Sequence, residues 1–464
     1  MAITLISKPS DFGRVWDTNR LTYCFSSNNY TQPNFQFYFS LIYWSWDGTQ
    51  NNIGNYLVYP NSGGTVTFNP SQIYRNYLSY DFNCSITGLT ECVNSSGRFS
   101  LSCYEYYGAP PAKLTDGSQW TGEVSSYPPM RFYNGCQMNI PFDYNPLNAK
   151  GNALWVMSGA TSGQFLTSAT EFRGDADDLM FLYFLDDLNG RPTRIRYTVY
   201  YNCYGGGLPA APNTLGVGNQ ISNTPLYTQD AVVGTNIILD SPLAVIPPSW
   251  SGICSTVVYD TNVSYSNYGF MHTIPCGPYQ VAKTALSGLS STWLYYTIDL
   301  MSGSTVLNKS PFYIWRNEKC DRFGGKWQLH WLNPQGGWDN YTFDRKFLNT
   351  TKIAKSTYKI KLPSDSSFNT YYSGERVFDT QITEEITLRS NLLTQKEAQL
   401  LTQLVQSPRV YVSYKYTYSG TTTVYGVPYI ITTDEWNYPS KVNDKEVNVE
   451  IKLRAANDKI IQRD

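Results

Sequence analysis

Only two histidines, His272 and His330, occur in the chain, and His330 lies a short way before an acid, Asp339. A catalytic relay of the Ser-His-Asp type needs a histidine, an acid that orients it and an activated serine. The G-x-S-x-G turn that presents the serine in one large class of hydrolases does not accompany these residues. Two histidines are also too few for a histidine-based metal cluster. We therefore expect no catalytic residue here, and we interpret His330 as a surface or interface histidine.

A group of acids is the second candidate for chemistry. Asp175, Asp177 and Asp178 stand in the sequence R-G-D-A-D-D, which resembles a cation-binding loop. The downstream glycine and glutamate of the EF-hand pattern are missing. We interpret the three aspartates as a solvated turn before a strand at 180–185, with a calcium site as the alternative. No metal ligand and no cofactor is assigned. Glycoside hydrolysis needs only two carboxylates at a set separation, so a polysaccharide-degrading enzyme stays open as a minor alternative.

The element that must position His330 and Asp339 is an aromatic block at 326–343, which reads K-W-Q-L-H-W-L-N-P-Q-G-G-W-D-N-Y-T-F. Its first part alternates apolar and polar residues, the period of a β-strand with one buried face. Proline and paired glycines then break the strand, because proline lacks an amide donor and glycine permits positive φ. We expect two aromatic strands that meet at this turn and form the core of a sheet. The structural or interface residues predicted here are Trp327, Trp331, Gly336, Gly337, Trp338 and Phe343.

The composition favours strands and close contact with neighbours. Charged residues make up 15% of the chain, against about 25% in ordinary globular proteins. Aromatic residues are frequent, with 39 Tyr, 12 Trp and 21 Phe, and they suit strands better than solvated helices. An aromatic-rich, charge-poor surface is typical of interfaces, so we expect a homo-oligomer in a symmetric assembly. The net charge of −1 gives no global field for nucleic acid or anionic lipid.

The sequence patterns do not predict a targeting segment, and the cysteines do not predict a metal or redox site. The N-terminal sequence lacks the basic start and apolar stretch of a signal peptide, and we expect no membrane-spanning segment because no run of about 18 apolar residues occurs. Nine cysteines are spread along the chain without a C-x-x-C pair, so a zinc or redox site has little support. We expect the cysteines to be reduced, small and buried.

The fold class predicted from these patterns is mainly β, with tandem β-sandwich-like domains and a C-terminal α+β unit. Three domains are expected: an N-terminal β domain with one short helix at 1–150, a middle β-sandwich at 151–314, and an α+β domain at 315–464. Short strands at turn-bounded intervals carry the first two. Asn69 and Pro70 predict the start of the short helix, and the sequence at 186–190 predicts a hairpin turn.

The C-terminal segment has the clearest local signals. A capping box at 394–397, with Leu393 and Ala398 placed as a hydrophobic staple, predicts a helix start. Leucine and valine at 400, 401, 404 and 405 form one apolar stripe, and Ser407-Pro408 ends the helix. Strands at 409–418 and 421–431 are expected to pair as a hairpin. Strict alternation at 446–453 predicts a half-buried strand, and all of these elements should share one sheet.

Several short sequences resemble a family of virion structural proteins from tailed phages of Bacteroidetes, including crAss-like and related phages. The resemblance spans most of the chain in short pieces, and it departs from the family pattern at Cys276 and Pro334. The pieces are Phe25-Ser26-Ser27-Asn28-Asn29, residues 32–35, residues 68–78, Phe165-Leu166-Thr167, Leu182-Tyr183-Phe184-Leu185, Pro275-Cys276-Gly277-Pro278, and a block similar to the family's L-N-x-x-G-x-x-x-x-x-F pattern at Leu332-Asn333, Gly336 and Tyr341–Phe343, in which one more residue precedes the Phe.

The resemblance implies a non-enzymatic particle component in the tail, baseplate or neck, made in the host bacterial cytoplasm and found in the virion. Its expected partners are copies of itself and other virion structural proteins. The alternative is a tail adhesin that recognises host-surface glycans. It requires solvent-exposed tryptophans or tyrosines as stacking platforms, and the candidates are Trp44, Trp46, Trp327, Trp331 and Trp338. The family supplies no catalytic residue.

Overall fold

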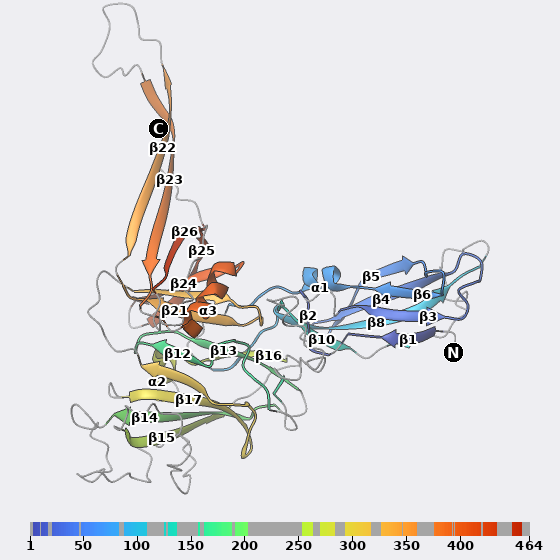
Figure 1. Cartoon of the computed structure of the whole chain (residues 1–464), viewed down its shortest axis with the longest axis horizontal. Coiled ribbons are helices and arrows are strands. Elements are labelled where there is room, and N and C mark those ends of the chain that lie inside the picture. Colours follow the sequence, from blue (N-terminus) through green and yellow to red (C-terminus); the bar gives the residue numbers. More distant parts are fainter. Residues whose placement is uncertain are drawn as a thin grey trace, which may run out of the picture. The chain divides into compact units, whose positions relative to one another are not determined.

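A computed structural model of the chain is mainly β, which confirms the predicted fold class: strands account for 58% of the described residues and helices for 9%, in five sheets. The strands and the few short helices are drawn in Figure 1. The structure describes residues 3–9, 11–16, 21–45, 48–82, 88–108, 125–126, 129–136, 156–157, 162–187, 191–202, 253–262, 270–283, 293–316, 326–345, 347–359, 375–391, 393, 395–418, 421–433 and 448–456.

The chain divides into two compact units. Unit 1 contains Met1–Asn317 together with Asn333–Asp339, and unit 2 contains Glu318–Leu332 together with Asn340–Asp464. The aromatic block is therefore shared, because its turn belongs to unit 1 and most of its two strands to unit 2. The three-domain division expected from the sequence stays a prediction.

The N-terminal part of unit 1 has two sheets over one aromatic core. One sheet has the order β1-β3-β6, and the other has the order β2-β10-β8-β4-β5 with β9 paired to β8. Phe25 and Phe68 of the first sheet pack on Phe39 of the second, with ring centroids 5.5 and 4.5 Å apart. The elements are β1 (Ile3–Ser7), β2 (Gly13–Arg14), β3 (Tyr23–Ser27), β4 (Gln36–Trp44), β5 (Gln50–Val58), β6 (Thr65–Phe68), α1 (Ser71–Tyr77), β8 (Ser96–Tyr106), β9 (Ser125–Ser126) and β10 (Met130–Tyr133).

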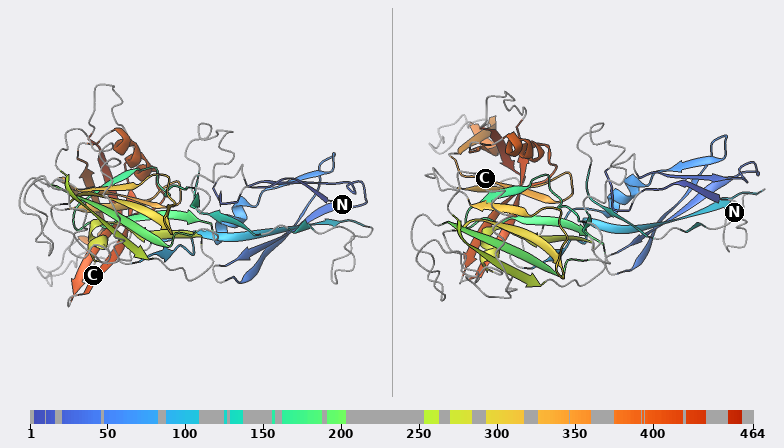
Figure 2. Two further views of the ribbon diagram at one scale, coloured as in Figure 1. Left: turned by 90° about the horizontal axis from the view of Figure 1, so that it is seen from below. Right: turned by 60° about the horizontal axis from the view of Figure 1, so that its bottom comes forward.

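Two further sheets follow in unit 1, with the orders β11-β13-β16-β7 and β12-β19-β17-β14-β15, the second with β18 paired to β17. Figure 2 draws most of their strands in green and yellow. The phenol of Tyr296 in β17 donates to the carbonyl of Cys276 at the end of β16, at 2.6 Å, so the two sheets meet. The elements are β7 (Thr90–Glu91), β11 (Val156–Met157), β12 (Glu171–Gly174), β13 (Phe181–Asp186), β14 (Arg194–Asn202), β15 (Ile253–Asn262), β16 (Met271–Pro275), α2 (Pro278–Lys283), β17 (Trp293–Ser302), β18 (Thr305–Val306) and β19 (Phe312–Arg316).

Unit 2 is built on one seven-stranded sheet with the order β21-β20-β24-β25-β26-β23-β22. Helix α3 packs on it, because Leu401 and Leu404 belong to the same buried cluster as Trp331, Ile451 and the other core residues. The elements are β20 (Trp327–Leu332), β21 (Trp338–Phe343), β22 (Leu348–Lys359), β23 (Glu375–Arg389), α3 (Gln395–Gln406), β24 (Val410–Tyr418), β25 (Thr421–Ile431) and β26 (Glu450–Ala455).

The local predictions for the C-terminal segment are confirmed. Strands β24 and β25 pair from Val410↔Tyr429 to Tyr418↔Thr421, as the hairpin signal requires. Helix α3 begins at Gln395, and the staple residues Leu393 and Ala398 are both buried in the core cluster. Thr394 lies outside the described residues, so the capping hydrogen bond itself is not described.

Two local expectations need correction or refinement. The hairpin turn predicted at 186–190 is wrong, because β13 and β14 belong to different sheets and β13 pairs with β16; residues 188–190 lie outside the described residues. Helix α1 begins at Ser71, one residue later than Pro70 at its first position would give. The Asn69 side chain accepts a hydrogen bond from the Ser71 amide at 3.0 Å.

The turn between β20 and β21 is fixed by Asn333. Its amide donates to the Gly337 carbonyl at 2.9 Å, and its side-chain oxygen accepts from the Gly337 amide at 3.0 Å. Its side-chain amide donates to the Leu166 carbonyl at 2.8 Å. A Cβ on Gly337 would lie 2.5 Å from that same carbonyl oxygen. Gly337 is therefore required by the close approach of two backbones.

We predict that Gly337→Ala destabilises unit 1 by about 1–3 kcal/mol, because the added methyl group overpacks a contact with backbone that cannot move aside easily. Thermal unfolding of the purified protein measures the loss. Gly63→Ala is the matched control, since its Cβ would meet only the Asn61 side chain at 3.5 Å, and it should shift stability by no more than about 0.5 kcal/mol. Equal stability of the two variants would show that the turn does not fit Leu166 as described.

Candidate functional site

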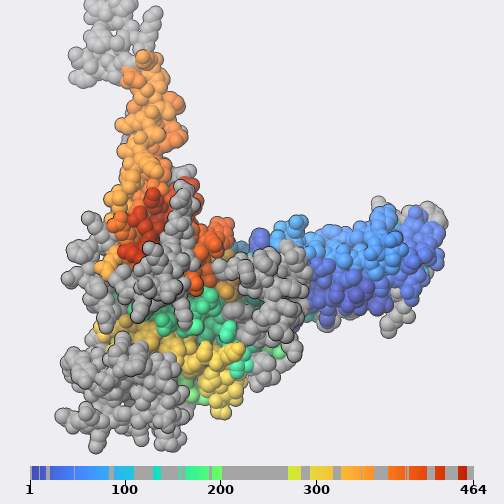
Figure 3. Space-filling model, in the orientation of Figure 1, coloured from blue at the N-terminus to red at the C-terminus, as the bar shows by residue number. Residues whose placement is uncertain are grey.

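The largest exposed feature of unit 2 is a two-stranded ribbon, which we define as β22 and β23. The two strands pair over the whole of β22, from Leu348↔Thr387 to Lys359↔Glu375. Strand β23 pairs with β26 only over Glu385–Arg389. Beyond that point the two strands extend together away from the rest of the sheet (Figures 1 and 3). The ribbon is therefore anchored at one end and stands alone along most of its length.

Large apolar side chains on the ribbon are exposed instead of packed. Leu348 and Phe378 are each 62% exposed and Ile353 is 58% exposed. Tyr358 and Val377 are exposed as well, and Tyr358 has only an edge contact with Phe378, at 6.4 Å between ring centroids. A two-stranded hairpin without a covered face is marginally stable in water. These side chains mark the ribbon as the candidate interaction surface of unit 2.

The apolar face of the ribbon continues the core face of the sheet. Residues two apart in a strand share a face, so Ile382, Ile386 and Leu388 of β23 point the same way. Leu388 is buried in the core of unit 2, and Ile386 packs against that core. Ile382 stands opposite the exposed Ile353. Glu384 lies between Ile382 and Ile386 on this face, so the apolar side chains that run from the core onto the ribbon are interrupted by one carboxylate.

The two strands of the ribbon carry opposite charge. Strand β22 has three lysines, Lys352, Lys355 and Lys359, and no acid. Strand β23 has four acids and two arginines, so it is net negative. Within the chain, the Lys352 ammonium lies 3.1 Å from the carboxylate of Glu385. Hydrogen bonds from Thr432 and then Lys352 lower the pKa of Glu385 below its ordinary value, so this carboxylate is held in its charged form.

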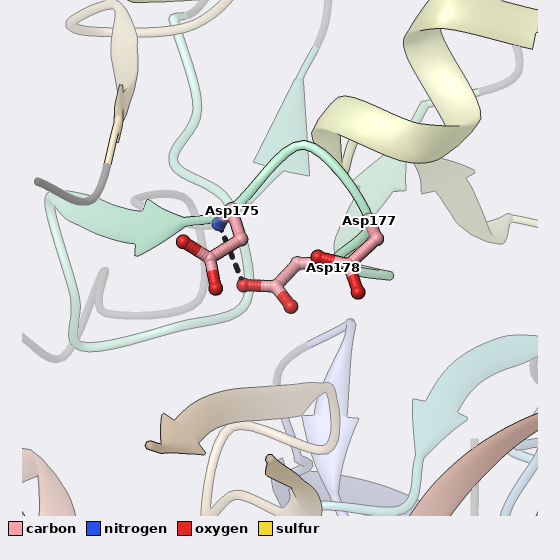
Figure 4. A group of neighbouring side chains, drawn as sticks. All are labelled: Asp175, Asp177 and Asp178. Atoms are coloured by element: carbon pink, nitrogen blue, oxygen red, sulfur yellow. Dashed lines mark hydrogen bonds between the residues drawn. The ribbon is translucent and has the colours of Figure 1, made fainter. Parts of the chain in front are cut away.

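The aspartate group of β12 and the following turn is the candidate cation site. The carboxylate oxygens of Asp175, Asp177 and Asp178 lie within 4.8 Å of one another (Figure 4). Asp175 and Asp178 are buried and Asp177 is exposed, so the prediction of a solvated turn is wrong for two of the three. An Asp178 carboxylate oxygen accepts from the Asp175 amide at 2.8 Å, which ties the turn together. The carboxylate thus has a structural role in the turn, and we assign no ion to the group.

A buried histidine–aspartate contact connects two strands of one middle sheet and escaped the sequence analysis. The His272 ring nitrogen Nε2 lies 2.7 Å from the Asp186 carboxylate, and both side chains are fully buried. The Arg191 guanidinium lies 3.3 Å from the same carboxylate. His272 stands in β16 and Asp186 ends β13, which pair directly. A buried charge needs such partners, and the group joins two strands and the segment after them.

The aromatic block supplies core residues of both units. Trp331 and Phe343 lie in the buried cluster of unit 2, and Trp327 packs against that cluster. Trp338 instead packs in unit 1, with its ring centroid 4.7 Å from that of Phe82. Gly336 has φ +89°, and a Cβ there would collide with the Asn134 carbonyl. None of these predicted residues belongs to the exposed ribbon.

His330 is buried, so its interpretation as a surface or interface histidine is wrong. Strand β20 lies between β21 and β24, and four consecutive residues of it, 328–331, are buried. Alternation therefore does not indicate an open face on this strand. The ring nitrogen Nε2 lies 3.1 Å from the Ser413 hydroxyl. Burial lowers the pKa of His330 to about 3, so the imidazole is neutral at physiological pH.

Asp339 is buried in unit 1. Burial raises the pKa of its carboxyl to about 7, although hydrogen bonding from Thr167 and Asn333 opposes the shift. The contacts of Asp339 and His330 are thus different: Thr167 and Asn333 for the acid, and Ser413 for the histidine.

Comparison with known proteins adds no family. Models of known protein families give no match to the chain, and a search of curated proteins gives no significant match.

Among the helices of the described residues, none is long and apolar enough to cross a membrane. Cys24, Cys92, Cys103, Cys136 and Cys276 are free thiols, and three of them are buried.

The two buried titratable groups of the aromatic block predict opposite pH dependences. Because the pKa of Asp339 is raised on folding, its contribution to stability is full below about pH 4 and is lost as the pH rises through about 7. Because the pKa of His330 is lowered, its contribution is full above about pH 6.5 and is lost as the pH falls toward about 3. Asp339→Asn should therefore remove a decline in stability between pH 4 and 7, and His330→Gln a decline at acid pH.

Thermal unfolding midpoints of the wild type and of both variants, measured from pH 3.5 to 8, check this. Each variant is the control for the other, because the expected changes in slope have opposite sign. A profile for Asp339→Asn that runs parallel to the wild type between pH 4 and 7 would contradict the raised pKa.

Proposed function

We propose that the chain is a structural component of a tailed-phage virion, in the tail, baseplate or neck, and that it acts by associating with copies of itself and with other virion proteins. The observation that carries the proposal is the ribbon. Its strands are exposed along most of their length, and its large apolar side chains lack a cover within unit 2. A two-stranded ribbon with such a surface is marginally stable in water, and an assembly partner would cover its apolar side chains.

The composition and the family resemblance support the same proposal. A chain with 15% charged residues and 72 aromatic residues (39 Tyr, 12 Trp and 21 Phe) suits a protein that buries surface against its neighbours. The tripeptide Phe165-Leu166-Thr167, one of the pieces that carries the resemblance, lies around the contact with the turn of the aromatic block, since Asn333 donates to the Leu166 carbonyl. The resembling pieces thus include residues that hold the fold together.

Among the described residues, the histidines and the Asp178 carboxylate make contacts that stabilise the fold. His330 is neutral and buried beside Ser413, His272 is buried against Asp186, and the Asp178 carboxylate holds a turn. A general acid or base must reach its substrate and titrate near the working pH, which a buried imidazole with a pKa of about 3 does not. These placements favour a non-enzymatic role.

A glycan-binding tail adhesin is the second candidate, and Trp16 is the observation that favours it. Its ring is 53% exposed and carries the Arg75 guanidinium 4.2 Å from the ring centroid. Of the tryptophans proposed as stacking platforms, Trp331 and Trp338 are buried, and Trp46 lies outside the described residues. We place this candidate second because one stacked tryptophan offers less surface than the ribbon.

We predict that the chain is present in gradient-purified virions in constant ratio to the other structural proteins. Quantitative mass spectrometry of the particles measures the ratio, and a phage enzyme found in the infected-cell lysate is the negative control. Detection of the chain in lysates with its loss from purified particles would contradict the proposal. Binding to host glycans that Trp16→Ala abolishes would favour the adhesin instead.

A further inference from the structure

We propose that the chain assembles by β-sheet addition through the ribbon: the outer edge of β22 in one copy pairs with the outer edge of β23 in the next. The proposal rests on the self-association in the proposed function and names the surface and the partner, a second copy of this chain. The contact is head-to-tail, because each copy gives its β22 edge to one neighbour and its β23 edge to the other.

The first step of the argument is that the ribbon offers two edges. In the sheet order of the described residues, β22 is the last strand, so its outer edge has no strand beside it. The outer edge of β23 is paired with β26 only at Glu385–Arg389. Backbone amides and carbonyls along such edges are a template for another strand, and main-chain hydrogen bonds to an added strand are a common mode of protein association.

The second step is that the charges favour contact between unlike edges. Two β22 edges would bring lysines against lysines, and two β23 edges would bring carboxylates against carboxylates. Like charges opposite one another destabilise a strand pair, and opposite charges stabilise it. A β22 edge beside a β23 edge places a strand with three lysines and no acid next to a net negative strand. Charge complementarity therefore selects the head-to-tail contact over a two-fold one.

The third step is that β22 and β23 already pair with each other within one chain, so the two sequences fit side by side as neighbouring strands. Within the ribbon, β22 and β23 already pair in antiparallel register, with Lys359 opposite Glu375 and Ile353 opposite Ile382. If ribbons of neighbouring copies point the same way, β22 of one copy is again antiparallel to β23 of the next. The same pairing can then repeat between copies over Thr351–Lys359, since β26 occupies the β23 edge from Glu385 onward, and it gives a continuous antiparallel sheet of ribbons.

The fourth step concerns the apolar side chains. Ile353 and Phe378 are exposed on a single ribbon, but in a sheet of ribbons each strand gains a neighbour on its open edge. Cross-strand contacts then cover part of each apolar side chain. A head-to-tail contact closes into a ring where the rotation between copies allows it, and otherwise gives a helical filament. Either form suits a repeated component of a particle.

The test reverses one charge on each strand. Lys355 and Asp379 are chosen because the residues opposite them within the ribbon, Thr380 and Ser356, are uncharged, so reversal places no like charges opposite each other there. Lys355→Glu alone and Asp379→Lys alone should each weaken self-association about tenfold. The double variant should associate no better than either single variant, because Asp379 stands beside Thr380, the residue opposite Lys355, and therefore points to the other face of the sheet. Lys309→Glu, an exposed lysine of unit 1, is the control for the change in net charge.

Analytical ultracentrifugation of the full chain over a range of concentrations measures the association, and circular dichroism confirms that each variant is folded. Stronger association of Lys355→Glu would overturn the proposal in favour of a two-fold contact between β22 edges. Unchanged association of both single variants, or a wild type that stays monomeric, would overturn it altogether. The composition of purified virions is measured separately, so the structural function can stand or fall independently of this interface.

Discussion

Backbone hydrogen bonding between strands is the constraint on which this protein depends. With 58% of the described residues in strands and 9% in helices, most backbone donors and acceptors must find their partners in another strand. Inside the five sheets they do, and aromatic side chains fill the space between the sheets. The constraint is unmet at the edges, and the longest edges of unit 2 lie along β22 and β23. The ribbon is therefore the part of unit 2 where another strand could pair with the longest open backbone edges.

The aromatic block shows how one short stretch can serve two units. Trp331 and Phe343 fill the core of unit 2, whereas the turn at Asn333–Asp339 belongs to unit 1. Asn333 holds that turn by hydrogen bonds to Gly337 and Leu166. Burial in this packing also favours the neutral forms of two titratable side chains, because it lowers the pKa of His330 and raises the pKa of Asp339.

Local signals in the sequence predict local structure well. The hairpin at 409–431, the helix of 395–406 and the alternating strand before Ala455 each depend on neighbours in sequence, and all three are present. Burial on the second face of a strand depends on distant residues instead, so His330 was misplaced. The same holds for Asp186, whose partner His272 is far away in the sequence. The ribbon was missed because each of its two long strands has only one aromatic residue, Tyr358 or Phe378. The β-branched residues at 350, 351, 353 and 357 are a signal that could have found it.

Hydrogen exchange of the ribbon amides tests the central claim most directly. In the dissociated chain, amides on the outer edges of β22 and β23 are open to water, while those between the two strands are hydrogen-bonded. The account predicts that assembly protects the outer-edge amides of Thr351–Lys359 and of the part of β23 before Glu385, with little change at β24 and β25. Equal exchange of the ribbon in the assembled and dissociated protein would contradict it.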